Sequence, residues 1–258
     1  MFTYLYPQFN KGRILKTEML TNLRDFPREF VDIHYADYSD GIVTGANLEV
    51  GPKHLIISPG IVRHEGRLYT LNKSTELAYL ATGKELVVKI RFLEVKEGSD
   101  LTVYTSEIVL DEQVECKSTE LELGRFKLKE GARLRQDYQN FADFTTEYNT
   151  LNVLHTSYAA HGESTVSPLV MRYFADQMLR SGSADPRDLV FAMMCANEGI
   201  VSRSLILHYI SGRMGIAYKD YTHVQIHKHL SRILDNVRSG GKARGSLAAG
   251  GPQRVIVD

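Results

Sequence analysis

The chain has few cysteines, no net charge and no long apolar run, and each of these absences argues against a class of proteins. Its 258 residues contain 2 Cys and 0 Trp. Cys116 and Cys195 are too far apart for a zinc motif, and two cysteines do not build a disulfide framework, so we expect folding in a reducing compartment. Lys plus Arg and Asp plus Glu both number 31, which gives no bulk attraction to nucleic acid or to an anionic membrane.

No apolar segment approaches the roughly 18 consecutive residues that a membrane-spanning helix needs. The N-terminal residues, MFTYLYPQFNKGRILK, lack the apolar core of a signal peptide. With 43% hydrophobic and 24% charged residues, the composition is that of a globular protein. The sequence therefore predicts a soluble chain without membrane insertion, long enough for one large domain or two of ordinary size.

The common catalytic and nucleotide-binding motifs are also missing. Gly241-Lys242 is the only Gly-Lys pair near a glycine cluster, and Ala243 replaces the hydroxyl residue of a P-loop. Near Ser164, Val166 stands where a nucleophile elbow needs its second glycine. The carboxylates of residues 94–122 offer no pair that can be placed across a sugar cleft, and on alternating strands we expect most of them to face water. We predict no catalytic residue and no enzyme activity.

Four histidines are the one candidate for a metal site. His223 and His227 are four residues apart on an expected helix, with His229 just beyond and His208 on the preceding helix. A zinc-protease helix also requires glutamate after the first histidine, and Val224 occupies that position. We interpret these side chains as structural or surface histidines and predict no metal and no cofactor.

Residues 1–40 predict an extended arm followed by a short helix. Thr17 is a candidate N-cap, apolar residues recur at helical spacing up to Asp25, and Pro27 is expected to end or bend the helix. The large apolar residues that follow must be covered, either by the next domain, which we favour, or by another subunit. The interface candidates here are Phe26, Phe30, Tyr35 and Tyr38.

Residues 41–133 predict a β-rich domain, a small antiparallel sandwich or an open barrel. Pro59-Gly60 suits the centre of a type II turn, and the residues around Gly66 suit a hairpin corner. Longer alternating segments, expected as strands, run over residues 85–95, 101–110 and 120–128, the last with a bulge at Gly124.

Residues 134–239 predict a helical bundle of four or five helices. The first is expected from Asp137, because apolar residues then recur at helical spacing. This stripe consists of Tyr138, Phe141, Phe144, Tyr148, Leu151 and Leu154. No Lys or Arg lies between Asp137 and Asn152, so we interpret the stripe as core or interface packing rather than a base-stacking platform. Tyr138 and Phe141 are added to the interface candidates.

Cap residues and glycines mark the other helices. Ser167-Pro168 and Asp185-Pro186 each combine an N-cap with proline at the first helical position, and Ser202 or Ser204 and Asp220 are expected to begin the last two helices. The expected ends are Gly182, Gly199, Gly212 and Gly240.

Residues 240–258 form a basic tail rich in glycine and alanine, the composition of a flexible linker. From Lys228 to the end there are six Lys or Arg and two Asp. Val255, Ile256 and Val257 are interface candidates, because such a segment can add a strand to another sheet. A frayed end is the equal alternative.

The segment from Asp40 to Leu71, with DGIVTGANLEV followed by HLIISPGIVRHEGRLYTL, resembles a β module near the start of baseplate and fibre-attachment proteins of bacteriophage tails. The order of parts resembles that of a family from prophages and phage-tail-like bacteriocins of Gram-positive bacteria. This resemblance implies a non-enzymatic structural subunit of a contractile-tail baseplate, made in the bacterial cytoplasm and incorporated in the tail particle. Its expected partners are other baseplate or tail-fibre subunits and further copies of itself.

Two other functions remain open. The first is nucleic-acid binding through the C-terminal helices and the basic tail, although the balanced net charge makes us favour protein partners. The phosphate contacts to test would be Arg203, Arg213, Lys219, Lys228 and Arg232. The second is a hydrolase with a carboxylate pair, which a concave pocket with perturbed carboxylates would indicate.

Overall fold

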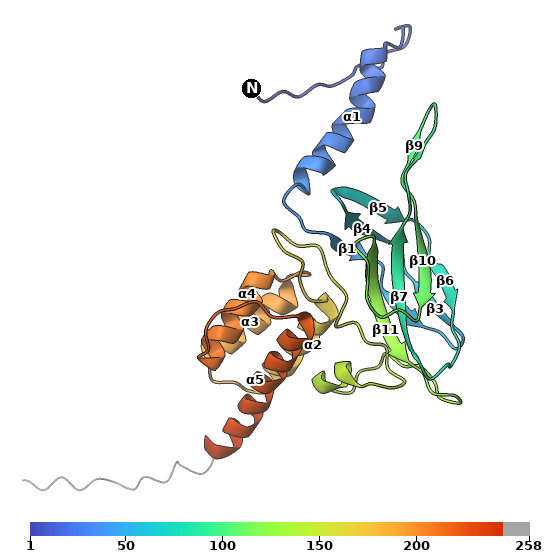
Figure 1. Ribbon diagram of the computed structural model, residues 1–258. Helices are drawn as coiled ribbons and strands as arrows, with labels where there is room; N and C mark the ends of the chain where they lie inside the picture. Colours follow the sequence, from blue (N-terminus) through green and yellow to red (C-terminus); the bar gives the residue numbers. More distant parts are fainter. Residues whose placement is uncertain (245–258) are drawn as a thin grey trace, which may run out of the picture.

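The structure is a computed structural model that describes the backbone of residues 1–244 and the side chains of residues 1–239 (Figure 1). The strand candidates Val255, Ile256 and Val257 lie outside the described residues. In chain order the described part forms an arm, a long helix, a β-rich part and a helical part. The long helix α1 stands beyond one end of the β-rich part, and the C-terminal helices lie beside the sheets (Figure 1).

Helix α1 runs over Thr17–His34, so the predicted end near Asp25 is wrong. Its N-cap is Lys16, without a side-chain capping bond, and Pro27 lies inside the helix. Proline has no N–H to give to the carbonyl four residues earlier, which normally interrupts a helix. No residue of α1 is buried, so water can take the place of that donor.

The β-rich part consists of small antiparallel sheets, as the sequence predicts. Its strands are β1 (Gly41–Gly45), β2 (Leu48–Val50), β3 (His54–Ile57), β4 (Gly60–His64), β5 (Arg67–Leu71), β6 (Thr75–Ala78), β7 (Glu85–Phe92), β8 (Lys96–Glu97), β9 (Thr102–Val103), β10 (Ser106–Asp111) and β11 (Glu120–Lys127). Three sheets have the orders β1-β4-β5, β2-β3-β6 and β10-β7-β11, and β8 pairs with β9. Within residues 1–244 they do not close into a barrel. Leu55, Val62, Ile90 and Phe126 lie in their common core.

Gly60 shows why the segment after Asp40 is rich in glycine. The strands on either side of Pro59 belong to different sheets, and Gly60 is not left-handed, so the predicted type II turn is wrong. A Cβ on Gly60 would lie 2.2 Å from the backbone nitrogen of Ala46. Glycine is required here because two backbone segments touch where the chain changes sheets.

Two other predictions in the sheets are confirmed. The β4–β5 hairpin turns at Glu65 and Gly66, which have φ angles of 46° and 75°. The register between β7 and β11 shifts between Glu122 and Gly124, where the bulge was expected.

The helix expected from Asp137 is wrong, because only Phe141–Thr145 is helical there, as the 3₁₀ helix η1. The neighbouring backbone forms isolated β-bridges instead. Asn152 pairs with Arg125 of β11, and Arg135 pairs with Thr150. Asn149 adopts a φ of 58°, which interrupts any continuous helix. The aromatic stripe is nevertheless largely buried, so the sequence predicts burial but not conformation.

The remaining helices are α2 (Pro168–Arg180), α3 (Pro186–Asn197), α4 (Arg203–Met214) and α5 (His223–Arg244). They share one hydrophobic cluster with η1, which includes Phe144, Phe174, Ile206 and Leu230. Asp185 and Ser202 cap their helices as predicted, each accepting a bond from a backbone N–H.

Three predicted helix boundaries in this part are wrong. Gly240 does not end α5, because that helix continues to Arg244. Helix α4 passes through Gly212 and ends at the left-handed Gly215. Helix α5 starts after Thr222 rather than Asp220, because Thr222 and Gln225 form a reciprocal capping box.

Candidate interaction surface

The N-terminal arm and α1 carry a large group of exposed apolar side chains. Its members are Met1, Phe2, Tyr4, Leu5, Tyr6, Phe9, Ile14, Leu15, Leu20, Leu23, Phe26, Phe30 and Ile33. Leu23 is 56% exposed, Phe30 63% and Ile33 77%. Exposure of this extent is expected when a neighbouring molecule covers the surface in the assembled state. We call this group the N-terminal apolar surface.

The structure brings four of the predicted interface residues to this region. The ring of Phe26 contacts that of Tyr4 edge-on at 5.9 Å, so the arm partly covers the helix. Phe30 stacks on His34, and the half-buried Tyr35 and Tyr38 continue this row of rings to the start of β1.

Tyr138 and Phe141 lie elsewhere. They are 8% and 2% exposed and belong to the core around η1. The Tyr138 hydroxyl donates to the carbonyl oxygen of Leu151 at 2.7 Å. Both residues therefore pack inside the chain, and the interface candidates that remain on the described surface are those of residues 1–40.

A cavity of about 1070 Å³ separates α1 from the sheets. Arg24, Arg28 and Asp32 line it from the helix, whereas Tyr69 of β5 and Ile108 of β10 line it from two sheet edges. The side of α1 toward the sheets thus carries three charged residues besides Pro27 and Val31, whereas Phe30 and Ile33 are not among the residues that line the cavity. This is the reverse of an ordinary surface helix, which turns its apolar side to the domain.

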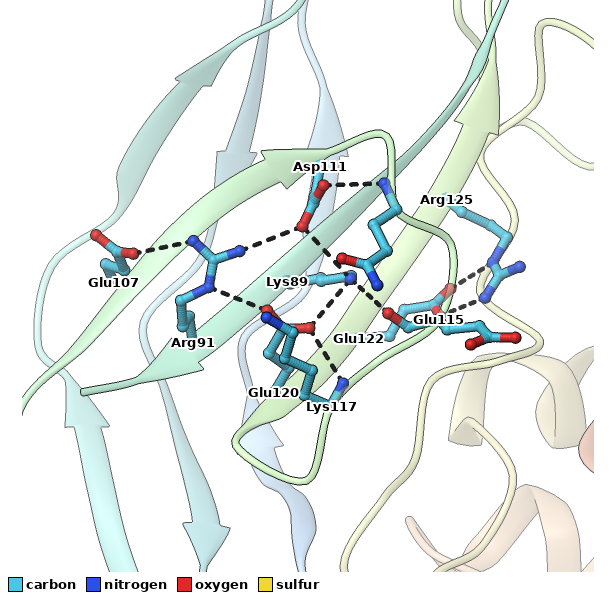
Figure 2. A network of polar contacts seen from close by, with 10 residues as sticks. Lys89, Arg91, Glu107, Asp111, Glu115, Lys117, Glu120, Glu122 and Arg125 are labelled. Carbon is cyan, nitrogen blue, oxygen red and sulfur yellow. Dashed lines mark hydrogen bonds and ion pairs between the residues drawn. The ribbon is translucent and has the colours of Figure 1, made fainter. Parts of the chain in front are cut away.

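A cluster of charged residues lies on the β10-β7-β11 sheet (Figure 2). Lys89 is fully buried, and its Nζ donates to the Glu115 carbonyl oxygen at 2.8 Å and to Glu120 at 3.1 Å. Arg91 contacts the other oxygen of Glu120 at 3.0 Å and Asp111 at 3.2 Å. The loop between β10 and β11 covers the cluster. Most of the carboxylates of residues 94–122 are exposed as expected, and the side chain of Glu120 is an exception.

The electrostatics of this cluster are those of a structural ion-pair network. Burial alone would raise the pKa of Glu120, but hydrogen bonds from the Lys117 N–H, Lys89 and Arg91 lower that pKa to about 2. A general acid at neutral pH needs the opposite shift. The cluster therefore holds three strands together and is not suited to proton transfer.

Cys116 and His155 line the same depression beside β11, with a volume of about 510 Å³. Burial and the nearby Glu122 raise the pKa of the Cys116 thiol. Burial and Arg125 lower the pKa of His155. A cysteine nucleophile needs a stabilised thiolate beside a protonated base, so both shifts oppose that chemistry.

The four candidate histidines are dispersed. His227 is 2% exposed and contacts the Phe141 carbonyl oxygen, while His208 and His229 contact Tyr218 and Tyr221 respectively. Over the residues with described side chains, no group of three or more His, Cys, Asp or Glu is placed to hold a metal ion.

Two of the five candidate phosphate contacts are engaged by carboxylates. Arg203 lies 2.7 Å from Asp220, and Arg213 lies 2.8 Å from the fully buried Asp188. The exposed candidates are Lys219, Lys228 and Arg232.

Among the described helices, none combines the length and apolar character that a membrane crossing requires.

The sequence matches no protein-family model and no curated protein. The fold is similar to that in the crystal structure of TssK, with a TM-score of 0.44 and 10% sequence identity. The match covers 90% of this chain and 71% of the TssK chain.

Proposed function

We propose that this chain is a non-enzymatic structural subunit of a contractile-tail baseplate, and that it joins its neighbours through the N-terminal apolar surface. The observation that carries the proposal is α1, a helix of 18 residues with exposed Leu23, Phe26, Phe30 and Ile33 and no buried residue. In proteins most of the stability of a helix comes from packing of its apolar face rather than from helix propensity. A neighbouring subunit supplies that packing.

The charged and nucleophilic side chains support a structural role. The buried carboxylate of Glu120 accepts hydrogen bonds from Lys89 and Arg91. The pKa of the Cys116 thiol is raised, so its thiolate form is disfavoured. Active sites hold groups whose pKa values are moved toward neutrality, and these groups are moved away from it. The ion-pair network around Glu120 instead holds the strands of the β10-β7-β11 sheet together.

The kind of particle that contains this subunit is proposed from the sequence. The glycine- and proline-rich segment from Asp40 to Leu71 resembles the β module of baseplate and fibre-attachment proteins, so the assembly would be a phage tail or a tail-like bacteriocin. The close approach of Gly60 to Ala46 gives that segment a structural reason of its own. Neighbouring baseplate or fibre subunits are the partners.

Quantitative mass spectrometry of intact tail particles from the encoding strain tests this function. The chain should keep a fixed ratio to the tube and sheath proteins through successive purification steps, while an abundant metabolic enzyme of the same cells is depleted. Intact particles from which the chain is absent would overturn the proposal.

A further inference from the structure

We infer that α1 packs against the α1 helices of other copies of this chain as a short parallel coiled coil. The inference rests on the proposed function and deepens it, because it names a second copy as the neighbour that covers α1. It comes from the spacing of the exposed residues, from the face they occupy and from the charges beside them.

Four exposed apolar residues of α1, together with the half-buried Met19, follow a heptad. Met19, Leu23, Phe26, Phe30 and Ile33 are separated by alternating steps of four and three residues. This spacing fills the a and d positions of a coiled coil, with Leu23 and Phe30 at a and the other three at d. This average of 3.5 residues per step keeps one seam in contact with a neighbouring helix, which a stripe that packs on a flat surface does not need.

The charged residues of α1 stand away from this seam. Arg24 pairs with Asp25 at 2.5 Å, and Arg28 lies 3.8 Å from Asp32. These residues occupy the b, c and f positions, and three of them line the cavity between α1 and the sheets. The seam thus points away from the chain's own sheets. The N-terminal arm touches it at Phe26 through the ring of Tyr4, and Leu23, Phe30 and Ile33 are exposed.

The residues that flank the seam are self-complementary. Glu29 occupies a g position, and His34 occupies the e position of the following heptad. In a parallel coiled coil a g residue faces the e residue of the next heptad on the neighbouring helix. Glu29 of one copy therefore meets His34 of another. The other flanking positions carry Leu20, Asn22 and Pro27, so no like charges oppose each other.

Cysteine cross-linking of the full-length chain tests the arrangement. In a Cys116→Ser background, which removes the exposed native thiol and leaves the buried Cys195, Leu23→Cys places a thiol at an a position. Equivalent a positions face each other across a parallel seam, within reach of a disulfide. Thr21→Cys is the matched control, because Thr21 is exposed and lies two residues away at an f position, on the opposite side of the helix from the seam.

Under mild oxidation, Leu23→Cys should give a disulfide-linked dimer as its main product on a non-reducing gel, and Thr21→Cys should stay mostly monomeric. Equal cross-linking of the two variants, or none in either, overturns the inference. Light scattering supplies a second readout: Phe26→Ser/Phe30→Ser should reduce the mass to that of one chain, whereas Arg28→Ser should not.

The two proposals fail separately. If Leu23→Cys does not cross-link but the chain is present in tail particles at a fixed ratio, a different protein covers α1, and only the coiled coil is refuted. If Leu23→Cys cross-links and the chain is absent from intact particles, only the baseplate function is refuted.

Discussion

His227 of α5 joins the C-terminal helix to the segment after the sheets, since its Nε2 lies 2.8 Å from the carbonyl oxygen of Phe141. The two rings also stack, with centroids 4.4 Å apart. Burial lowers the pKa of His227, so the ring is neutral and its Nε2–H donates to that carbonyl oxygen. A neutral, hydrogen-bonded histidine therefore holds together residues that are distant in sequence.

The helical part should lose stability as the pH falls. Burial lowers the pKa of His227 below 6.5 and, together with Arg203, lowers that of His223 to about 4. Between pH 6.5 and about 4 the unfolded chain therefore binds protons that the folded chain excludes, and the free energy of unfolding decreases. Urea unfolding followed by circular dichroism at pH 7.5, 6.5 and 5.5 measures this decrease.

The variant His227→Gln should be less stable at pH 7.5 and show a shallower decrease toward pH 5.5. The exposed His208 serves as the control, and His208→Gln should keep the wild-type pH profile. Identical pH slopes for wild type and His227→Gln would show that His227 does not contribute.

The buried lysine of the sheet makes Glu120 indispensable to stability. Glu120→Gln leaves the fully buried Lys89 without its nearest carboxylate, and we expect a loss of about 3 kcal/mol in the free energy of unfolding. Glu107 also pairs with Arg91, but its side chain is 45% exposed, so Glu107→Gln should cost less than about 1 kcal/mol. Urea unfolding compares the two, and equal losses would contradict the account.

Backbone contact at Gly60 gives a third prediction. Gly60→Ala forces the new methyl group against the Ala46 nitrogen and should cost about 2 kcal/mol or more through backbone shifts. Gly212 lies inside α4 with open space around it, so Gly212→Ala should instead stabilise the chain by about 0.5 kcal/mol. Thermal unfolding of both variants shows whether each one raises or lowers the stability. A Gly60→Ala variant as stable as the wild type would refute the contact.

Removing the apolar residues of α1 should affect association and not folding. Because α1 has no buried residue, Phe26→Ser/Phe30→Ser should change the midpoint of thermal unfolding of the monomeric chain by no more than about 2 °C. The matched change Phe174→Ser, in the core of the helical part, should cost at least about 3 kcal/mol. A large loss of monomer stability in the α1 variant would mean that the helix packs on its own domain.

Sequence patterns predicted local features well and long-range ones poorly. The caps at Asp185 and Ser202 and the bulge at Gly124 follow from bonds within a few residues, and all three are confirmed. The prediction of a helix after Asp137 failed because a β-bridge between Arg135 and Thr150 and a left-handed Asn149 outweigh the aromatic spacing. No local pattern reveals these tertiary partners.

The apolar character of α1 is visible in the sequence, but its exposure is not. The favoured expectation, that the next domain covers these residues, is wrong for Phe26 and Phe30, because both are exposed. The expectation that Pro27 ends or bends the helix also hides the continuation of α1 to His34. The buried ion pair of Lys89 was missed because alternation places a lysine outside. Only the loop that contributes the Glu115 carbonyl oxygen turns that position into an interior one.

The most direct test of the account is the amount of the chain that co-purifies with intact tail particles when α1 is altered. Phe26→Ser/Phe30→Ser and the control Arg28→Ser, expressed at equal levels in a strain that lacks the native chain, would be quantified against the tube protein. We predict that the Arg28→Ser chain is incorporated at the wild-type ratio and that the double variant is reduced at least tenfold. Full incorporation of the double variant would contradict the claim that α1 joins this chain to its neighbours.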